Sequence, residues 1–312
     1  MTAVGTVLAG LDIGGTKTHV RVESLDGRVL ADVVEPSETW SATPVEEAAR
    51  WIAAAVERHR PEGGTVAAIA AGAQGCDTEE HCAELGHALT AVAGVPGVVT
   101  NDAALLAPAA GLESAIGVIA GTGSIAVAVR PDGTLVFAGG WGWVIGDEGS
   151  APALVREAAR AALTRHDAGG DDDVLLPALL DAFGVDSAVG LARTVNDTPA
   201  AEHWAPKAPA VFAAAQRGSA DARRVITAGA ESLAYLVGVL VARGAGSTDV
   251  VAAGGVMTSQ PDLFAAFRDA LTRDHPQLAV HLLREPPVAG AVALARRLHG
   301  APHLRSNHVR EL

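Results

Sequence analysis

The sequence is poor in several residue types, and each scarcity excludes a class of protein. Its 312 residues include two cysteines, Cys76 and Cys82, which are too few for a disulfide framework. Nothing around them has the spacing of a zinc site. We therefore expect both cysteines to be small buried or half-buried residues without a metal.

Lysine is equally scarce, and its positions exclude one family of phosphate-binding proteins. The two lysines, Lys17 and Lys207, do not complete the P-loop pattern G-x-x-x-x-G-K-[ST]. Residues 121–126 match the dinucleotide fingerprint G-x-G-x-x-A, but they continue into a strand-like run instead of opening a helix. The sequence thus excludes a Rossmann dinucleotide site as well.

Long apolar runs and excess positive charge are also missing. No apolar run approaches the roughly 20 residues that a membrane-spanning helix needs. The formal net charge of −13 disfavours nonspecific binding to nucleic acid or to an anionic membrane. Residues 2–10 lack the basic start of a signal peptide and have the pattern of a buried strand. We expect a cytoplasmic protein without nucleic-acid or membrane partners.

Two glycine-bearing turns carry most of the positive information. Asp12-Ile13-Gly14-Gly15-Thr16-Lys17-Thr18 and Gly121-Thr122-Gly123-Ser124 each connect two apolar, strand-like runs. Because glycine has no side chain, such a turn brings backbone N–H groups close to a phosphate. Two turns of this kind, each opening a strand-rich half of the chain, indicate a duplicated nucleotide-binding clamp.

Periodicity and turn residues predict the same element order in both halves. The helix expected from 44 begins at Thr43-Pro44, with Thr43 as N-cap and proline at the first helical position. For the first half we expect strands at 6–12, 17–24, 28–34, 65–71 and 97–101 and helices at 44–59 and 78–93. For the second half we expect strands at 115–121, 124–130, 134–138, 248–253 and 278–283 and helices at 151–165, 174–183, 187–194, 205–217, 220–243, 260–273 and 287–299. The Asp26-Gly27 and Asp132-Gly133 pairs mark hairpins, 167–173 is an expected loop, and 303–312 has no periodic pattern.

The doubled order resembles the superfamily of sugar kinases, actin and heat-shock chaperones. The resemblance covers residues 6–298 and rests on five segments in the family's order. They are the two glycine turns, Thr100-Asn101-Asp102-Ala103, Val251-Ala252-Ala253-Gly254-Gly255-Val256 and Pro287-Val288-Ala289-Gly290-Ala291. It implies an α/β, duplicated RNase H-like (actin-like ATPase) fold with two domains around a nucleotide cleft. We expect one domain at 1–112, with helix 287–299 packing back on it, and the other at 113–286 with a helical insertion.

Asp102 is the candidate general base. It follows an apolar strand end, where a carboxylate can take a proton from an attacking hydroxyl, and the resemblance implies a catalytic aspartate at this point. From the residues alone, Asp102 is equally a cap of the following helix. The resemblance also implies that Asp12 holds Mg²⁺, while a turn-starting aspartate that bonds its own backbone is the alternative.

The resemblance implies an ATP site as well. Its phosphate-binding residues are Gly14, Gly15, Thr16, Lys17, Gly121, Thr122, Gly123 and Ser124, and its adenosine-side residues are Ala205, Gly254 and Gly255. Lys17 is equally a solvated strand residue.

The segment from Gly139 to Ser150 narrows the resemblance to the N-acetylglucosamine and glucosamine kinases of the BadF/BadG-type ATPase family. It reproduces their G-G-W-G-x-x-x-G-D-E-G-S pattern. Tryptophan beside aspartate is suited to a sugar, because the ring covers an apolar face and the carboxylate accepts hydroxyl protons. The alternative is a helix N-terminus that favours acids. The implied substrate-binding residues are Glu38, Trp40, Asp102, Gly140, Trp141 and Asp147.

The expected function is transfer of the γ-phosphoryl group of ATP to the 6-hydroxyl of an amino sugar, in an enzyme that relatives suggest is a homodimer. Glu38 and Ile125 replace asparagines of the mammalian-type kinases, which leaves the choice between N-acetylglucosamine and glucosamine open. Glu38 either pairs with a free 2-ammonium, accepts a ring hydroxyl or points to solvent.

Two other functions use this fold. One is an ATPase activator of a 2-hydroxyacyl-CoA dehydratase-type reductase, which needs cluster-binding cysteines that Cys76 and Cys82 do not resemble. The other is a sugar-responsive repressor, which needs a DNA-binding domain ahead of Asp12. We expect neither.

Overall fold

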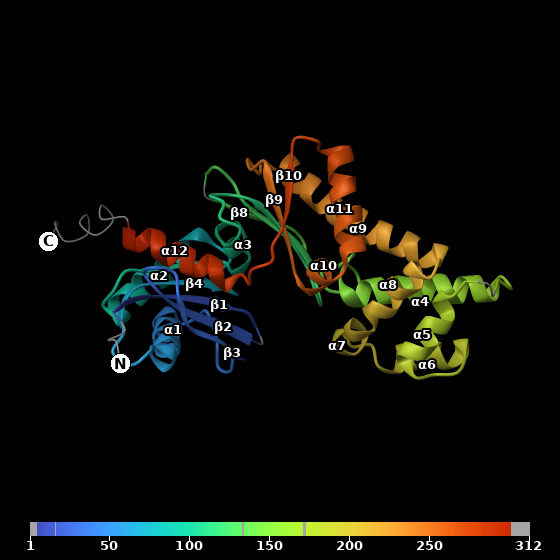
Figure 1. Cartoon of the computed structure of the whole chain (residues 1–312), viewed down its shortest axis with the longest axis horizontal. Coiled ribbons are helices and arrows are strands. Elements are labelled where there is room, and N and C mark those ends of the chain that lie inside the picture. The colour runs from blue at the N-terminus through green and yellow to red at the C-terminus, as the bar shows by residue number, and fades with distance from the viewer. Residues whose placement is uncertain (1–4, 16, 133, 171–172, 301–312) are drawn as a thin grey trace. The chain divides into compact units, whose positions relative to one another are not determined.

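The computed structural model describes residues 5–15, 17–132, 134–170 and 173–300. The chain divides into two compact units (Figure 1). Unit 1 comprises Met1–Ala115, Val129–Leu135 and Glu285–Leu312, and unit 2 comprises Ile116–Ala128 and Val136–Arg284. The two domains expected from the sequence, 1–112 with helix 287–299 and 113–286, remain a prediction.

Unit 1 is built on a five-stranded sheet in the order β3-β2-β1-β4-β5. β1 pairs antiparallel with β2 and parallel with β4, and β4 pairs parallel with β5. The strands are β1 (Thr6–Ile13), β2 (Lys17–Ser24), β3 (Val29–Pro36), β4 (Thr65–Ala73) and β5 (Gly97–Thr100). The helices are α1 (Val45–His59), α2 (Glu79–Ala93), η1 (Asp102–Leu105), α3 (Leu106–Ala109) and α12 (Val288–Gly300).

Both faces of this sheet are buried. Alternate residues of β1, such as Leu11 and Ile13, pack with α1 and α2, whereas Leu8 faces α12 together with Ala68 and Val292. Figure 1 shows α12 in red along the sheet. This double burial explains why β1 is an almost continuous apolar run instead of an alternating one.

Unit 2 repeats the same frame. Its sheet has the order β10-β9-β6-β7-β8, which is the order of unit 1 read from the other edge. β6 pairs antiparallel with β7 and parallel with β9, just as β1 pairs with β2 and β4. The predicted duplication is confirmed. The strands are β6 (Ile116–Ala120), β7 (Ser124–Val129), β8 (Leu135–Gly139), β9 (Asp249–Ala253) and β10 (Ala279–Leu282).

Helices supply the rest of unit 2. They pack with its sheet into one apolar core. They are α4 (Ala151–Asp167), α5 (Leu175–Phe183), α6 (Ala188–Asp197), α7 (Ala201–Trp204), η2 (Ala205–Lys207), α8 (Ala208–Gln216), α9 (Ala220–Ala242), α10 (Gly255–Ser259) and α11 (Pro261–Asp274).

Three local predictions were wrong. The helix predicted at 205–217 is divided into η2 and α8, since Pro206 and Pro209 lack the N–H groups of a continuous helix. α1 begins at Val45 after Pro44, and no side chain caps it, so Thr43 is not its N-cap. The short helix α10 stands where only a glycine loop was expected. Gly133 of the second predicted hairpin, residues 171–172 of the predicted loop and the tail 303–312 lie outside the described residues.

α9 corrects the expectation that no segment is apolar enough to span a membrane. Among the described residues, α9 alone is a single helix that is long and apolar enough to cross a membrane. The bent pair of α5 and α6 would also be long and apolar enough if the two helices formed one span. In unit 2, α9 packs against α4, α8 and α11, with Val225, Leu233 and Val237 in the core. A helix buried in the core of a globular unit can be as long and as apolar as a membrane-spanning helix.

Candidate functional site

The two predicted acids of unit 1 lie at one end of its sheet. Asp12 is the second-last residue of β1 and is paired with Gly72 of β4. A Cβ on Gly72 would lie 3.0 Å from the Asp102 Cα and 2.5 Å from the Leu105 side chain. The missing side chain at position 72 therefore lets the turn that carries Asp102 pack against β4 beside Asp12.

Burial perturbs both carboxyl groups. Burial, with a smaller contribution from the nearby negative charge of Asp102, raises the pKa of Asp12 to about 7. Burial also raises the pKa of Asp102, although its hydrogen bond from the backbone N–H of Ala103 acts in the opposite direction. Perturbed acids of this kind are common at functional sites. The sequence predicted both residues for the site, and their roles as general base and Mg²⁺ residue remain predictions.

The residue before Asp102 has a defined structural role. Asn101 is buried, and its Oδ1 accepts a hydrogen bond of 3.0 Å from the Ala103 N–H. Its Nδ2 donates to the carbonyl oxygen of Cys76 at 3.3 Å and to Oδ1 of Asp77 at 3.1 Å. Asn101 is the N-cap of η1, so Asp102 is not required for that task, although its Oδ1 also accepts from the Ala103 N–H at 3.0 Å.

The first glycine turn is closed by its own backbone. The N–H of Gly14 donates to the carbonyl oxygen of Lys17 at 3.0 Å. Gly15 lies against the side chain of Gln74, since a Cβ at position 15 would be 2.5 Å from Gln74 Oε1. Lys17 is exposed at the start of β2. The predicted phosphate-binding residue Thr16 lies outside the described residues.

The segment with Glu38 and Trp40 forms an aromatic wall. The rings of Trp40 and Trp51 meet edge to face with centroids 5.1 Å apart. The Trp40 indole N–H donates to the carbonyl oxygen of Gln74 at 3.2 Å, and the Trp51 indole N–H donates to that of Glu38 at 3.2 Å. Glu38 is thus held through its backbone carbonyl group, and the residue is exposed to solvent.

In unit 2 the second glycine turn is fixed by the segment before α4. The carbonyl oxygen of Gly121 accepts from the Ala151 N–H at 2.8 Å. The buried hydroxyl of Ser124 donates to the carbonyl oxygen of Glu148 at 2.9 Å. Thr122 is exposed between them and is free to present its hydroxyl to solvent. Ser124 therefore anchors this turn.

Asp147 supports the same turn from its other side. It is 8% exposed and has a φ of 56°, and its Oδ1 accepts from the Gly142 N–H at 3.2 Å. A Cβ on Gly123 would lie 3.0 Å from Asp147 Oδ2. Burial raises the pKa of Asp147, and hydrogen bonding to Gly142 opposes this shift.

The two tryptophans of this segment differ. Trp141 is 76% exposed, whereas Trp143 packs against Trp204 with ring centroids 5.0 Å apart. Gly140, the other predicted sugar contact here, has a φ of 76° and lies against Ile125.

The predicted adenosine-side glycines join the second turn, but Ala205 belongs to the helical part of the unit. Gly254 has a φ of 97°, and a Cβ there would lie 2.4 Å from the carbonyl oxygen of Ala120. A Cβ on Gly121 would lie 3.7 Å from the Gly255 nitrogen. Ala205, in η2, instead packs with the apolar core of unit 2.

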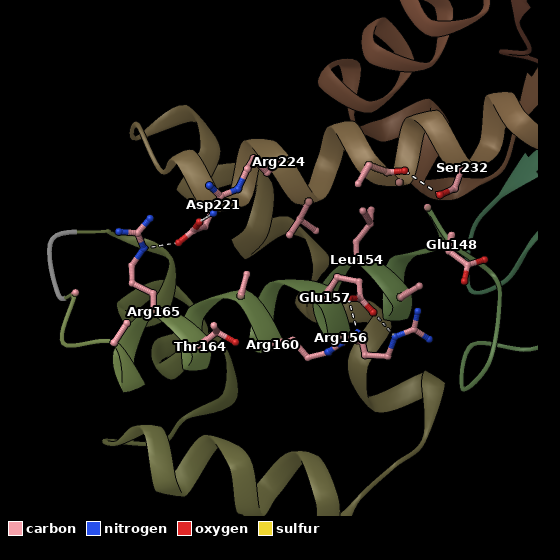
Figure 2. A pocket seen from close by; sticks show the side chains of 18 residues that line it. Glu148, Leu154, Arg156, Glu157, Arg160, Thr164, Arg165, Asp221, Arg224 and Ser232 are labelled. Carbon is pink, nitrogen blue, oxygen red and sulfur yellow. Dashed lines mark hydrogen bonds and ion pairs between the residues drawn. The ribbon is translucent and has the colours of Figure 1, made fainter.

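A large groove of unit 2 lies between α4 and α9, with a volume of about 860 Å³. Figure 2 shows Arg165 of α4 and Arg224 of α9 directed toward Asp221, and Arg156 and Arg160 toward Glu157. Of the predicted segments, only Gly139–Ser150 reaches this groove, through Glu148 and Gly149. Most of the predicted site residues therefore do not line this groove. Its four arginines donate hydrogen bonds to Asp221 and Glu157.

Sequence reasoning missed the loop after β4. Gln74 and Asp77 had no assigned role, and Asn101 was only part of a motif. The signal available in the sequence was a polar, glycine-containing stretch, Gln74-Gly75-Cys76-Asp77, directly after an apolar strand. No group of three or more possible metal-ligating side chains was found in the described part of the chain.

Comparison with protein families and relatives gives a consistent picture. The model of the BadF/BadG/BcrA/BcrD ATPase family matches residues 9–294. An N-acetylmuramic acid/N-acetylglucosamine kinase of Clostridium acetobutylicum is 27% identical over 297 residues, which are 92% of this chain and 97% of that protein. An N-acetyl-D-glucosamine kinase of Dictyostelium discoideum is 25% identical, over 75% of this chain and 79% of its own length.

A solved structure shares the fold. The structure of a candidate N-acetylglucosamine kinase from Chromobacterium violaceum matches with a TM-score of 0.63 and 25% identity. The match covers 93% of this chain and 98% of the other. The similarity therefore extends over both units.

Proposed function

The chain belongs to the BadF/BadG/BcrA/BcrD ATPase family, and on this basis we propose that it is an ATP-dependent kinase of an amino sugar. The predicted family and fold class are confirmed. Relatives named as N-acetylglucosamine kinases support a sugar as the phosphoryl acceptor. The observation that carries the proposal is the pair of half-buried acids, Asp12 and Asp102, beside a glycine turn at the end of one sheet.

In this proposal Asp102 accepts the proton of the sugar 6-hydroxyl as its oxygen attacks the γ-phosphorus. Burial supports that role, because a carboxylate with a raised pKa is a stronger base than an exposed one. Asn101 holds the Asp102 backbone through its bond to Ala103, so the base is positioned before the sugar binds.

Asp12 is the proposed Mg²⁺ residue, with the ion held directly or through water. The fit rests on two half-buried carboxyl groups, of which the charge of Asp102 raises the pKa of Asp12, and a divalent cation offsets this repulsion. Mg²⁺ needs only one or two carboxylates and keeps several waters, so a larger cluster of ligands is not required. When bound with ATP, the ion neutralises charge on the phosphate oxygens.

The glycine turns are the proposed phosphate contacts. Gly15 in unit 1 and Thr122 and Gly123 in unit 2 are proposed to present backbone or hydroxyl donors to phosphate oxygens. Gly14 and Gly121, whose N–H groups bond the carbonyl oxygens of Lys17 and Gly123, are proposed to shape the two turns around the phosphates. Lys17 adds positive charge at the first turn. Gly254 and Gly255 are proposed on the adenosine side because they lie next to Gly121, and Ala205 and Thr16 are proposed from the resemblance alone. Ser124 is proposed to act through its backbone, since its hydroxyl bonds Glu148.

For the sugar we propose Trp40, Gly140, Trp141 and Asp147 as contacts, with Glu38 deciding between N-acetylglucosamine and glucosamine. An exposed glutamate near an aromatic wall favours a substrate with a free ammonium, whereas an N-acetyl group favours a neutral niche. N-acetylglucosamine is the first substrate because the relatives act on it. The homodimer and the cytoplasmic location remain predictions.

The test is a panel of hexoses and amino hexoses with ATP and Mg²⁺, read as ADP release and as the position of the new phosphate. We expect a 6-phosphate of N-acetylglucosamine or glucosamine. Turnover of glucose or mannose with neither amino sugar would contradict the amino-sugar assignment. A brown protein containing iron and sulfide would instead support the reductase-activating ATPase.

A further inference from the structure

The loop after β4, residues 74–77, contacts three candidate segments of unit 1. The N–H of Gln74 donates to the carbonyl oxygen of Ile13 at 2.8 Å, directly before the first glycine turn. Its carbonyl oxygen accepts from the Trp40 indole at 3.2 Å. At the other end, Asn101 donates to Cys76 and Asp77. The loop is therefore fixed to the phosphate turn, the aromatic wall and the segment with the general base.

The side chain of Gln74 lies over the first glycine turn. A Cβ on Gly15 would be 2.5 Å from its Oε1 and 3.4 Å from its Nε2. Gln74 is exposed, and within the described residues no hydrogen bond engages its side-chain amide. An amide with two N–H donors thus lies at the first glycine turn without a hydrogen-bond partner among the residues that the structure describes.

We propose that Gln74 is a substrate-contacting residue, whose side-chain amide donates a hydrogen bond to a γ-phosphoryl oxygen of ATP bound over Gly15. The inference rests on the proposed kinase function. A neutral donor aimed at oxygens that gain charge in the transition state lowers the barrier without adding a counterion. The three backbone anchors hold the residue in place, so little ordering is needed when ATP binds.

The phosphoryl group is favoured over the sugar as its partner for a geometric reason. Gln74 uses its backbone carbonyl toward the aromatic wall, through Trp40, and its side chain toward Gly15. Removing the side chain should therefore affect phosphoryl transfer while the wall keeps its hydrogen bond.

The test compares Gln74→Ala and Gln74→Glu with Gln216→Ala, a control at the C-terminal end of α8 in unit 2. We expect kcat to fall about 10- to 100-fold in Gln74→Ala, because one donor is lost from an open site. Gln74→Glu keeps the size but faces the phosphates with a negative charge, so kcat should fall at least as far. The sugar Kd, measured by calorimetry, and the Tm should stay close to wild type in all three variants.

The outcomes separate this inference from the proposed function. A wild type that phosphorylates no sugar in the panel contradicts the kinase proposal itself, and this inference with it. An active wild type with kcat within twofold in both Gln74 variants overturns only the role of Gln74. If only the Kd or KM for the sugar changes in the Gln74 variants, Gln74 contacts the sugar beside the aromatic wall, and the proposed contact with the phosphoryl group is wrong. If Gln74→Ala lowers the Tm, the kcat of the isosteric Gln74→Glu decides whether Gln74 contacts the phosphoryl group.

Discussion

The two units share a sheet but differ at the residues that end its strands. β1 of unit 1 has Asp12 as its second-last residue, whereas the matching strand β6 of unit 2 has Ile119 there. Two residues beyond the end of β5 stands Asp102, and at the same distance beyond β10 stands Arg284. The duplicated frame fixes where side chains lie, and the residue at each strand end determines the chemistry.

Buried polar groups show the same division. In unit 2, Ser124 bonds the backbone of Glu148, Asp147 bonds the backbone of Gly142, and Ser150 caps α4. In unit 1, Asp12 and Asp102 are half-buried, and the charge of Asp102 raises the pKa of Asp12. We infer that unit 1 carries the reactive acids and that unit 2 holds the second glycine turn rigid. Substitutions in the two units test this division.

The largest effect is expected for Asp102→Asn. The amide cannot accept the hydroxyl proton, so kcat should fall about 10³-fold, which corresponds to about 4 kcal/mol in the barrier. The Kd for the sugar should stay within about tenfold, since the side chain keeps its shape. Steady-state kinetics and calorimetry measure the two quantities.

Asp262→Asn is the matched control, because Asp262 is an exposed acid in the first turn of α11 in unit 2. Its kcat should equal that of wild type. The acidic limb of the kcat/KM profile should also lie above pH 3.8, since burial raises the pKa of Asp102 and only the ionised form is a base. A near-normal kcat of Asp102→Asn would mean that Asp102 is not the general base.

The next largest effect concerns the rigidity of unit 2. In Gly254→Ala the new Cβ meets the Ala120 carbonyl oxygen at 2.4 Å, and φ is 97°, where alanine is strained. Backbone atoms cannot move aside as a side-chain end can. We expect a loss of about 3 kcal/mol in the free energy of unfolding, measured by denaturant titration.

Gly142→Ala separates strain from steric overlap. Its φ is 85°, but the Cβ would meet nothing within 4 Å, so the expected loss is about 1 kcal/mol. Equal losses at the two positions would mean that the contact between Gly254 and β6 does not stiffen the unit.

Local sequence signals predicted much of the frame. Apolar periodicity located the strands, and Asp26-Gly27 predicted a hairpin in which Gly27 has a φ of 90°. The order of the strands within each sheet was not predicted, because pairing between distant strands has no local signal, and the family resemblance implied only the duplicated fold. Proline was the main source of error, since Pro206 and Pro209 divide a helix whose apolar pattern runs through them.

The site was predicted less completely than the fold. Asp12 and Asp102 stand in recognisable motifs, so sequence reasoning found them. The contact of Gln74 with Gly15 joins the loop after β4 to the turn after β1, and the bond of Asn101 to Asp77 joins two loops. Such contacts depend on packing, which a single sequence does not reveal. Trp141 is largely exposed within the structure although its motif suggested a stacked ring.

A smaller effect, with a defined sign, is expected for Asp12→Asn without Mg²⁺ or nucleotide. The folded protein holds the Asp12 proton up to about pH 7, whereas the unfolded chain releases it near 3.8. Stability therefore falls as pH rises through this window. The variant should gain about 2 kcal/mol relative to wild type between pH 5 and pH 8, a value reduced for partial exposure. Denaturant titrations at both pH values measure it.

Asp26→Asn is the control of opposite sign. The Ser24 hydroxyl lowers the pKa of Asp26, so Asp26 titrates below pH 3.8 in the folded protein and near pH 3.8 in the unfolded chain, and both values lie below pH 5. The difference between this variant and wild type should be constant from pH 5 to pH 8. A constant difference for Asp12→Asn as well would mean that the two acids of unit 1 are not forced together.

The smallest effect distinguishes anchoring from binding within the second glycine turn. Ser124→Ala removes the hydrogen bond to Glu148 and leaves a carbonyl oxygen without that donor, so stability should fall by about 1 kcal/mol. The KM for ATP should not change, because the backbone still presents its N–H groups. Thr122→Val should do the reverse, raising the KM for ATP severalfold at unchanged stability, since Thr122 is exposed. If Ser124→Ala instead raised the KM and left stability unchanged, its hydroxyl would be a phosphate ligand, and unit 2 would bind phosphate through side chains as well as holding it by its frame.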